Sequence, residues 1–212
     1  MYAMYDNEHL LHLSSLAEAA AAVWPIRQLL RTQTHQAHEH LERVALLTEL
    51  ASGGIALPRY RQYLQRMQSF HAALDTSLVG RLPAVYAIRR LDQSAHLACD
   101  LQALDADTMP APRSLCQAVD ALTPDAAAVW GVLYVLEGAR LGSQVLLRRN
   151  AANPAVRQAH AFIEGEGQRT GSCWRNFCGL LEQGAASHDA QALTVAATHT
   201  FVLLGEWLED PP

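Results

Sequence analysis

Apolar residues recur at intervals of three and four along most of the chain, which is the period of an α-helix, and no segment alternates apolar and polar residues as a strand would. Proline and glycine separate these helical stretches. The pattern predicts an all-α, single-domain protein with roughly eight helices around one core. The expected helices cover about residues 25–52, 58–79, 83–104, 114–122, 124–149, 154–164, 172–183 and 188–208.

Capping residues define two of these boundaries. Thr123, Pro124 and Asp125 predict a cap, a first-turn proline and a carboxylate that favours the helix dipole at the start of the long helix. Ser187 with Asp189 predicts the cap of the last helix. Residues 1–22, which include an alanine run, are expected to form a mobile or docked lead-in, and residues 23–209 the helical domain.

Composition narrows the classes of function. Half of the 212 residues are apolar, the net charge is −5 and there is no basic block, so a nucleic-acid or membrane-surface role is not expected. The 16 basic residues are all arginine, which excludes Schiff-base and P-loop lysine chemistry. The longest apolar run, residues 126–136, is too short for a bilayer span of about 20 residues. Without a secretory signal at its start, the chain is expected to be cytoplasmic.

His38 has the most informative surroundings of the ten histidines. It lies on the apolar stripe of the first helix, between Thr34 and Leu41, and Glu42 follows four residues later, where a carboxylate can reach back to the ring. An imidazole that ligates a metal through one nitrogen usually has its other nitrogen fixed by such a group. The spacing fits an axial ligand with its orienting carboxylate, and it also fits an ordinary His–Glu pair on a helix surface.

Gly138 and Gly142 interrupt the long apolar helix at the i and i+4 positions of one face. Each interior glycine costs a helix about 0.5–1 kcal/mol relative to alanine. Two explanations remain open: the bare strip lets a flat ligand approach the backbone, or it lets another helix pack closely. With the first explanation, a planar ligand would lie between His38 and this strip.

Three segments resemble the biliverdin-producing haem (heme) oxygenases. The stretch from Leu30 to Glu42 is similar to the family's proximal-helix motif, with Arg31, Thr34 and His38 in register. The sequence LYVLEGARLG, residues 133–142, resembles the distal-helix motif, especially that of bacterial members associated with bacteriophytochromes. The third match, residues 170–177, is followed by Phe201 and Trp207 in the last helix.

This resemblance implies a helical fold that holds haem between a proximal and a distal helix. It implies that His38 is the axial ligand of the haem iron and that haem is both cofactor and substrate. The implied reaction is oxidative cleavage of haem to biliverdin, ferrous iron and CO by O2. The residues implied to bind the cofactor are His38, Glu42, Arg31, Tyr134, Arg175 and Phe201, with the two arginines facing the propionates.

The resemblance also bears on partners. No flavin or nicotinamide motif is present, so electrons are expected from an external donor, a ferredoxin or a flavin reductase. A bacteriophytochrome is the bilin acceptor that the distal motif suggests.

One departure from the family concerns the distal helix. Many members have an aspartate directly after the first distal glycine, whereas this chain has Ala139. The proton-delivery group is therefore open: the candidates are backbone groups with ordered water and the side chains of Arg140 and Ser143, beside the distal-helix residues Gly138 and Gly142. Two alternatives stay open: a non-catalytic haem carrier or sensor, and a helical protein of related architecture that binds no haem.

Overall fold

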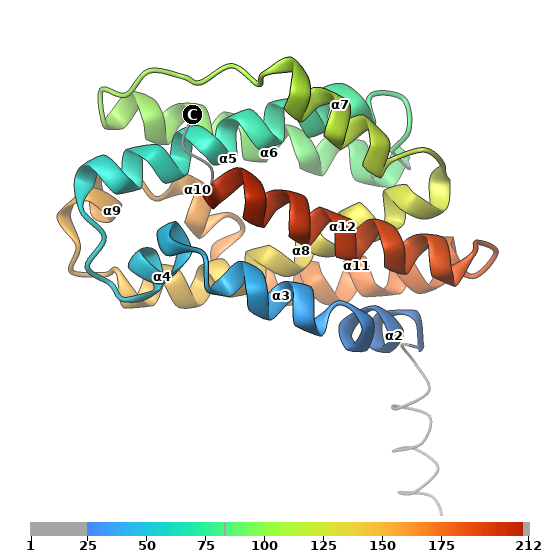
Figure 1. Cartoon of the computed structure of the whole chain (residues 1–212). Helices are drawn as coiled ribbons and strands as arrows, with labels where there is room; N and C mark the ends of the chain where they lie inside the picture. Colours follow the sequence, from blue (N-terminus) through green and yellow to red (C-terminus); the bar gives the residue numbers. More distant parts are fainter. Residues whose placement is uncertain (1–24, 83, 210–212) are drawn as a thin grey trace, which may run out of the picture.

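The computed structural model describes residues 25–82 and 84–209, with the side chains of residues 84–92 left undescribed. The described residues contain helices and no strand (Figure 1), which confirms the predicted all-α fold. The elements are α2 (Pro25–Gln33), α3 (His35–Glu42), α4 (Ala45–Ala51), α5 (Leu57–Leu78), α6 (Ala84–Ala103), α7 (Arg113–Leu122), α8 (Ala126–Arg149), α9 (Pro154–Gln158), α10 (Ala161–Glu164), the 3-10 helix η1 (Gly167–Arg169), α11 (Thr170–Ala185) and α12 (Ala190–Glu209). The predicted lead-in, residues 1–22, lies outside the described residues.

The single helix predicted over residues 25–52 is wrong, because the chain forms three shorter helices there. The Thr34 hydroxyl donates to the carbonyl of Leu30 at 2.7 Å, a back-bond that bends helices, while the backbone ladder continues from His38 N to Thr34 O at 2.9 Å. At Val44 the backbone is extended, with φ −58° and ψ 135°, and the side chain is fully buried. The two changes of direction let α2, α3 and α4 curve around the core.

The cap of α8 is Asp125 rather than the predicted Thr123. Its carboxylate accepts a hydrogen bond from Ala128 N at 2.9 Å. Thr123 is buried, and its hydroxyl pairs with that of Ser77 at 2.8 Å while Arg81 donates to its carbonyl at 2.6 Å. Thr123 therefore joins the start of α8 to α5 and to the turn that follows α5.

Close backbone contact joins α8 to α12. A Cβ built on Gly131 would lie 2.2 Å from the carbonyl oxygen of Leu193 and 3.0 Å from the amide nitrogen of Ala197. Gly184 on α11 likewise leaves room for the Trp130 ring, because a Cβ built on Gly184 would lie 2.2 Å from the nearest ring atom. These two glycines are the ones that helix packing requires.

Replacing Gly131 with alanine is expected to lower the free energy of unfolding by about 1–3 kcal/mol, because the backbone of α12 must move to accept the methyl group. Urea unfolding followed by circular dichroism measures the change. Gly138→Ala on the same helix is the matched control, since its added Cβ would sit an ordinary 3.7 Å from Trp174. Equal stability of the two variants would contradict the close crossing.

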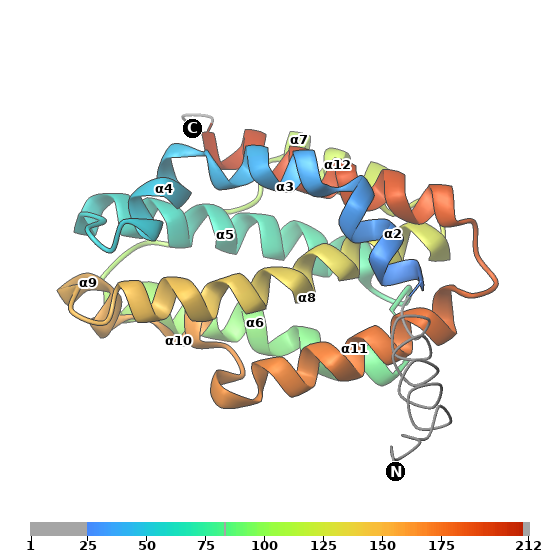
Figure 2. The ribbon, with the colours of Figure 1, turned by 90° about the horizontal axis from the view of Figure 1, so that it is seen from below.

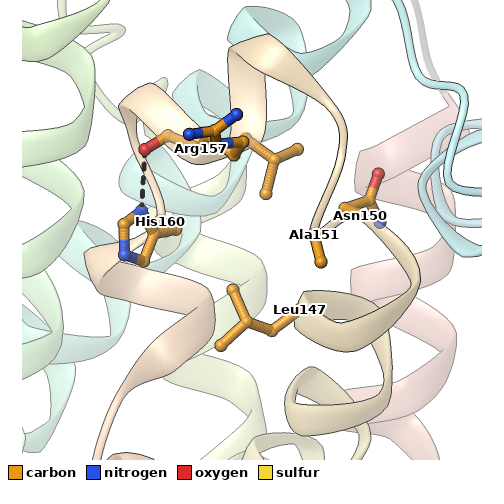
Figure 3. A pocket seen from close by; sticks show the side chains of 6 residues that line it. Leu147, Asn150, Ala151, Arg157 and His160 are labelled. Atoms are coloured by element: carbon orange, nitrogen blue, oxygen red, sulfur yellow. Dashed lines mark hydrogen bonds between the residues drawn. The ribbon is translucent and has the colours of Figure 1, made fainter.

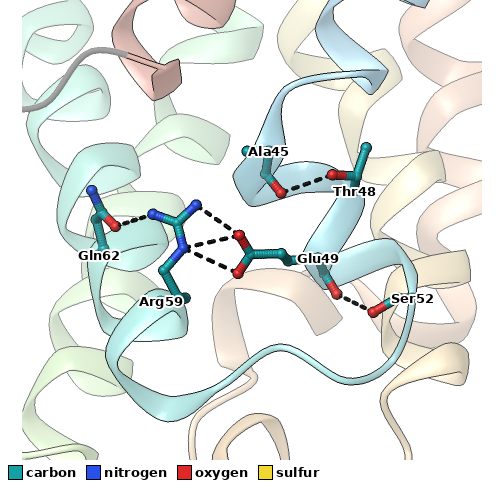
Figure 4. A network of polar contacts seen from close by, with 6 residues as sticks. All are labelled: Ala45, Thr48, Glu49, Ser52, Arg59 and Gln62. Atoms are coloured by element: carbon teal, nitrogen blue, oxygen red, sulfur yellow. Dashed lines mark hydrogen bonds and ion pairs between the residues drawn. The ribbon is translucent and has the colours of Figure 1, made fainter.

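A salt bridge braces the turn between α4 and α5 (Figure 4). Arg59 donates from Nε to both carboxylate oxygens of Glu49 at 3.0 Å and from Nη2 at 2.8 Å, and its Nη1 donates to Gln62 at 2.5 Å. The hydrogen bonds from Arg59 lower the pKa of Glu49 below its usual range. Both side chains are more than one-third exposed, so water screens the pair.

The Glu49–Arg59 pair predicts a pH-dependent difference between the wild type and Arg59→Gln. Because the folded-state pKa of Glu49 is lowered, the pair stabilises the fold above the unfolded pKa of about 4.3 and loses this effect as pH falls through the folded pKa. We expect a difference below about 1 kcal/mol at pH 7 that disappears in acid. Urea titrations of both proteins from pH 7 to pH 3 test this, and a pH-independent difference would contradict it.

No single helix within the described ranges is long and apolar enough to cross a membrane, although α7 and α8, bent by 112° at their junction, reach that length and composition as a pair.

Candidate functional site

Tyr134 joins α8 to the bend between α2 and α3. Its hydroxyl lies close enough to the Thr34 side chain for Thr34 to lower its pKa, and its ring packs against Trp174 at a centroid distance of 5.8 Å. Burial raises the pKa of Tyr134, although the positive charges of Arg27 and Arg31 act in the opposite direction. Both arginines therefore lie close to a neutral phenol at this end of α8.

Asparagine side chains join the opposite end of α8 to the turn after α4. The buried Asn150 donates from Nδ2 to the carbonyl of Leu50 at 2.7 Å. Asn153 donates in the same way to the carbonyls of Gly53 and Ile55, at 3.3 and 3.0 Å. Gly53 has φ +81°, and a Cβ there would lie 2.6 Å from a carbonyl oxygen of α8. The two segments meet tightly at this end.

Between these two junctions, the path α2–α4 and α8 run in the same direction (Figure 2). Tyr134 and Asn150 are sixteen positions apart on α8, and Thr34 and Leu50 are sixteen positions apart on the path α2–α4. A straight helix of that length would measure about 24 Å in each case. The path α2–α4 is bent twice, whereas α8 is continuous. His38 and Gly138 each lie one turn beyond the Thr34–Tyr134 junction.

Gly138 and Gly142 make no close contact of the kind seen at Gly131. A Cβ on Gly138 would be in ordinary contact with Trp174, and one on Gly142 would meet no described atom within 4 Å. The same side of α8 has two partly exposed apolar side chains, Leu141 at 37% and Val145 at 38%. Close helix packing therefore does not explain these two glycines within the described part of the chain, and the strip between the junctions is bare and apolar.

His38 is half exposed on α3 and has a partner on either side. Its ring lies edge-on to the buried Phe201 of α12, with 5.3 Å between centroids. Its Nδ1 is 3.8 Å from Glu42 Oε1, which leaves Nε2 as the nitrogen available to a metal. His35 forms a similar pair with Glu39 at 3.4 Å, so the contact with Phe201 is what distinguishes His38.

The other predicted binding residues lie toward the Tyr134 end. Arg31 is exposed at the end of α2 and close enough to influence Tyr134. Arg175 is exposed on α11, directly after Trp174. Sequence reasoning missed Arg27, whose charge acts on Tyr134 more strongly than that of Arg31. The spacing could have indicated it, because Arg27 and Arg31 are four residues apart on one helix and so lie on the same face.

Arg140 and Ser143 are both engaged within the protein. The Ser143 hydroxyl donates to the carbonyl of Ala139 at 3.1 Å. Arg140 pairs with Glu137 and with Glu166, which places its guanidinium against the segment before α11. Glu137 is only 4% exposed and was also missed from sequence, since a carboxylate within an apolar run gives no indication of its partner.

A separate pocket of about 240 Å³ lies where α8 meets α9 (Figure 3). Leu147, Ala151 and His160 line it, and the ring of His160 is 3.2 Å from the carbonyl of Arg157. None of the predicted site residues lines this pocket, which is smaller than typical ligand cavities of about 300–1,000 Å³.

Comparison with known proteins identifies the family. The profile of the family described as "Heme oxygenase" matches residues 25–210, which is nearly the whole chain. The chain belongs to the haem oxygenase family. The all-α fold and the oxidoreductase class predicted from sequence are therefore confirmed, and the ligand of this family is haem.

Two relatives agree with the haem oxygenase assignment. A heme oxygenase of Xanthomonas campestris pv. campestris (strain 8004) is 32% identical over 161 residues, which cover 71% of this chain and 88% of the relative. The solved structure of a heme oxygenase from Leptospira interrogans superposes with a TM-score of 0.69 at 16% identity and covers 87% of this chain and 98% of that one. The second likeness shows the fold.

His38 and the α8 strip of Gly138, Leu141, Gly142 and Val145, together called the slot, have chemistry that fits a haem ligand. A porphyrin is flat and largely apolar, and the strip formed by Gly138, Leu141, Gly142 and Val145 is bare and apolar. The iron requires one donor from the protein, which the imidazole of His38 would supply. No cluster of three or more histidine, cysteine or acidic residues that could hold a separate metal ion occurs among the described residues.

Proposed function

We propose that this haem oxygenase cleaves haem to biliverdin, ferrous iron and CO, with O2 as oxidant, and that haem lies between His38 on α3 and the bare strip of α8. The observation that carries the proposal is the pair of glycines at residues 138 and 142. Glycine weakens the interior of a helix, and at both positions the described protein atoms leave room for a Cβ. A ligand that must approach the backbone accounts for this cost.

Each residue on the slot has a defined role in this proposal. His38 binds the iron through Nε2, while Glu42 attracts the Nδ1 proton and Phe201 limits rotation of the ring. Gly138 and Gly142 let the ligand approach the helix backbone on the opposite face. Bound haem supplies the redox centre at which O2 is activated. Water ordered by the backbone is the proton source we propose, because Arg140 and Ser143 are engaged elsewhere.

The end of the bare strip near Tyr134 is the proposed place for the propionates. Arg31, on the path that carries His38, and Arg175, beside Trp174, supply positive charge there, and a carboxylate at an arginine gains a charge-assisted hydrogen bond. Arg27 adds a third positive charge at this end of the slot.

The proposed partners follow from the reaction. Electrons come from a ferredoxin or a flavin reductase, and a bacteriophytochrome accepts the bilin, which the resemblance of residues 133–142 to the phytochrome-associated branch supports. The proposed location is the cytoplasm, with no nucleic-acid or membrane partner.

Hemin titration followed by reduction in air tests the proposal. We expect a saturable one-to-one complex with a Soret band, and then loss of that band with growth of a bilin band when electrons are supplied. The runner-up function, a haem carrier or sensor, is suggested by Ala139 at the position of the usual aspartate. A stable Soret band under reductant and air would favour the carrier, and failure to form any complex would contradict both functions.

A further inference from the structure

The glycine-bearing part of α8 is held from a second side by ion pairs. Arg140 Nε lies 3.4 Å from Glu137 Oε1, and Arg140 Nη1 lies 3.5 Å from Glu166 Oε1. Glu137 and Arg140 are one turn apart on α8 and enclose Gly138 in sequence, whereas Glu166 lies just before η1. The same stretch of helix thus faces the slot on one side and this cluster on another.

A hydrogen bond extends the cluster along α8. Gln144 donates from Nε2 to the backbone carbonyl of Glu164 at 2.8 Å. Residues 137, 140 and 144 follow helical spacing, so they form one face, about a third of a turn from the face of residues 138 and 142. Segment 164–169 is attached to α8 on both sides of Gly142.

The charges in this cluster are removed from water. Glu137 is 4% exposed, Arg140 11% and Glu166 14%. A buried charge is costly without its partner, so each of these groups holds the others in one arrangement. Arg169, which is 79% exposed, pairs with the outer oxygen of Glu166 at 3.2 Å and belongs to the solvent side.

We propose that Arg140 is a positioning residue: through Glu137 and Glu166 it clamps the glycine-weakened stretch of α8 to segment 164–169 and so fixes the distance between the bare strip and His38. The inference rests on the proposed function of the slot. In this role Arg140 does not contact the reacting atoms. It also explains how a helix with two interior glycines keeps one face in a fixed place.

The test separates positioning from stability by removing both buried charges together. In the double variant Glu137→Leu/Arg140→Met no buried charge loses its partner, since Arg169 still neutralises Glu166, and such apolar replacements are often tolerated. We expect near-native helicity and unfolding midpoint, but exchange of the backbone amides of residues 138–146 in the apoprotein about tenfold faster than in the wild type. Hemin affinity should fall about tenfold, and the product should contain a wider mixture of biliverdin isomers than the wild type forms.

Two further variants control the experiment. Arg140→Lys keeps the positive charge and should retain most of the wild-type exchange protection. Arg169→Ala removes the exposed partner of Glu166 and should leave amide exchange and hemin affinity unchanged. Wild-type exchange and wild-type isomer ratio in the double variant would overturn the positioning role. Because exchange is measured without haem, failure of the clamp is distinguishable from failure of the proposed function, which would appear as a wild-type protein that binds no hemin.

Discussion

His38→Ala is expected to abolish normal ligation of the haem iron and to lower turnover at least about 100-fold, because loss of an orienting partner alone typically costs 10–100-fold. The slot would keep its apolar wall, so weak hemin binding can persist without the imidazole. Optical and electron paramagnetic resonance spectra of the ferric complex measure the ligation. Added free imidazole should restore part of the wild-type spectrum, because the cavity left by the side chain can admit it.

His35→Ala is the matched control for this experiment. His35 lies on the same helix and has its own glutamate partner, but 68% of its side chain is exposed and it lacks the contact with Phe201. Spectra and turnover of His35→Ala should match those of the wild type. A wild-type spectrum from His38→Ala, or an equal loss in both variants, would contradict the assignment of His38 as axial ligand.

Gly142→Leu is expected to weaken hemin binding while leaving the apoprotein folded. A Cβ at residue 142 meets no described atom within 4 Å, so we expect the new side chain to cost the apoprotein little and to overlap the proposed position of the ligand. Overpacking typically costs about 1–3 kcal/mol, which corresponds to roughly 5- to 150-fold in affinity. Titration with hemin and urea unfolding of the apoprotein measure the two effects separately.

Gly142→Ala supplies the size control. It should raise the free energy of unfolding of the apoprotein by about 0.5–1 kcal/mol, because alanine is the better helix former and no close contact opposes it. Its loss of hemin affinity should be smaller than that of the leucine variant. If Gly142→Leu binds hemin as tightly as the wild type does, this strip of α8 is not the wall of the haem site.

Sequence patterns were most reliable where the physical cause is local. The ends of α5, α7 and the short helix at Pro154 follow from proline and glycine, and the side-chain Oδ1 of Asn153 accepts from Ala155 N at 3.0 Å as an N-cap should. The prediction failed at Thr34 and Val44, where apolar spacing continues through the two bends. Those bends arise from a side-chain back-bond and from burial of Val44 against α12, and residue spacing encodes neither.

The candidate site divides in the same way. The pairing of His38 with Glu42 follows from a four-residue spacing, so it was predictable, and the structure adds Phe201 from a helix far along the chain. The engagement of Arg140 was not predictable. Its partner Glu166 lies beyond two helices and several turns, and only packing brings the two charges within 3.5 Å.

The sequence by itself determined the all-α class, the approximate position of most helices and the family motifs, because hydrogen bonding and apolar spacing within a helix involve residues only three or four apart. The tertiary structure alone decided what each glycine of α8 does. Gly131 meets the backbone of α12, whereas Gly142 meets no described atom, and the sequence around the two gives no sign of this difference. The space beside a glycine is set by elements some sixty residues away, and these become neighbours only when the core packs.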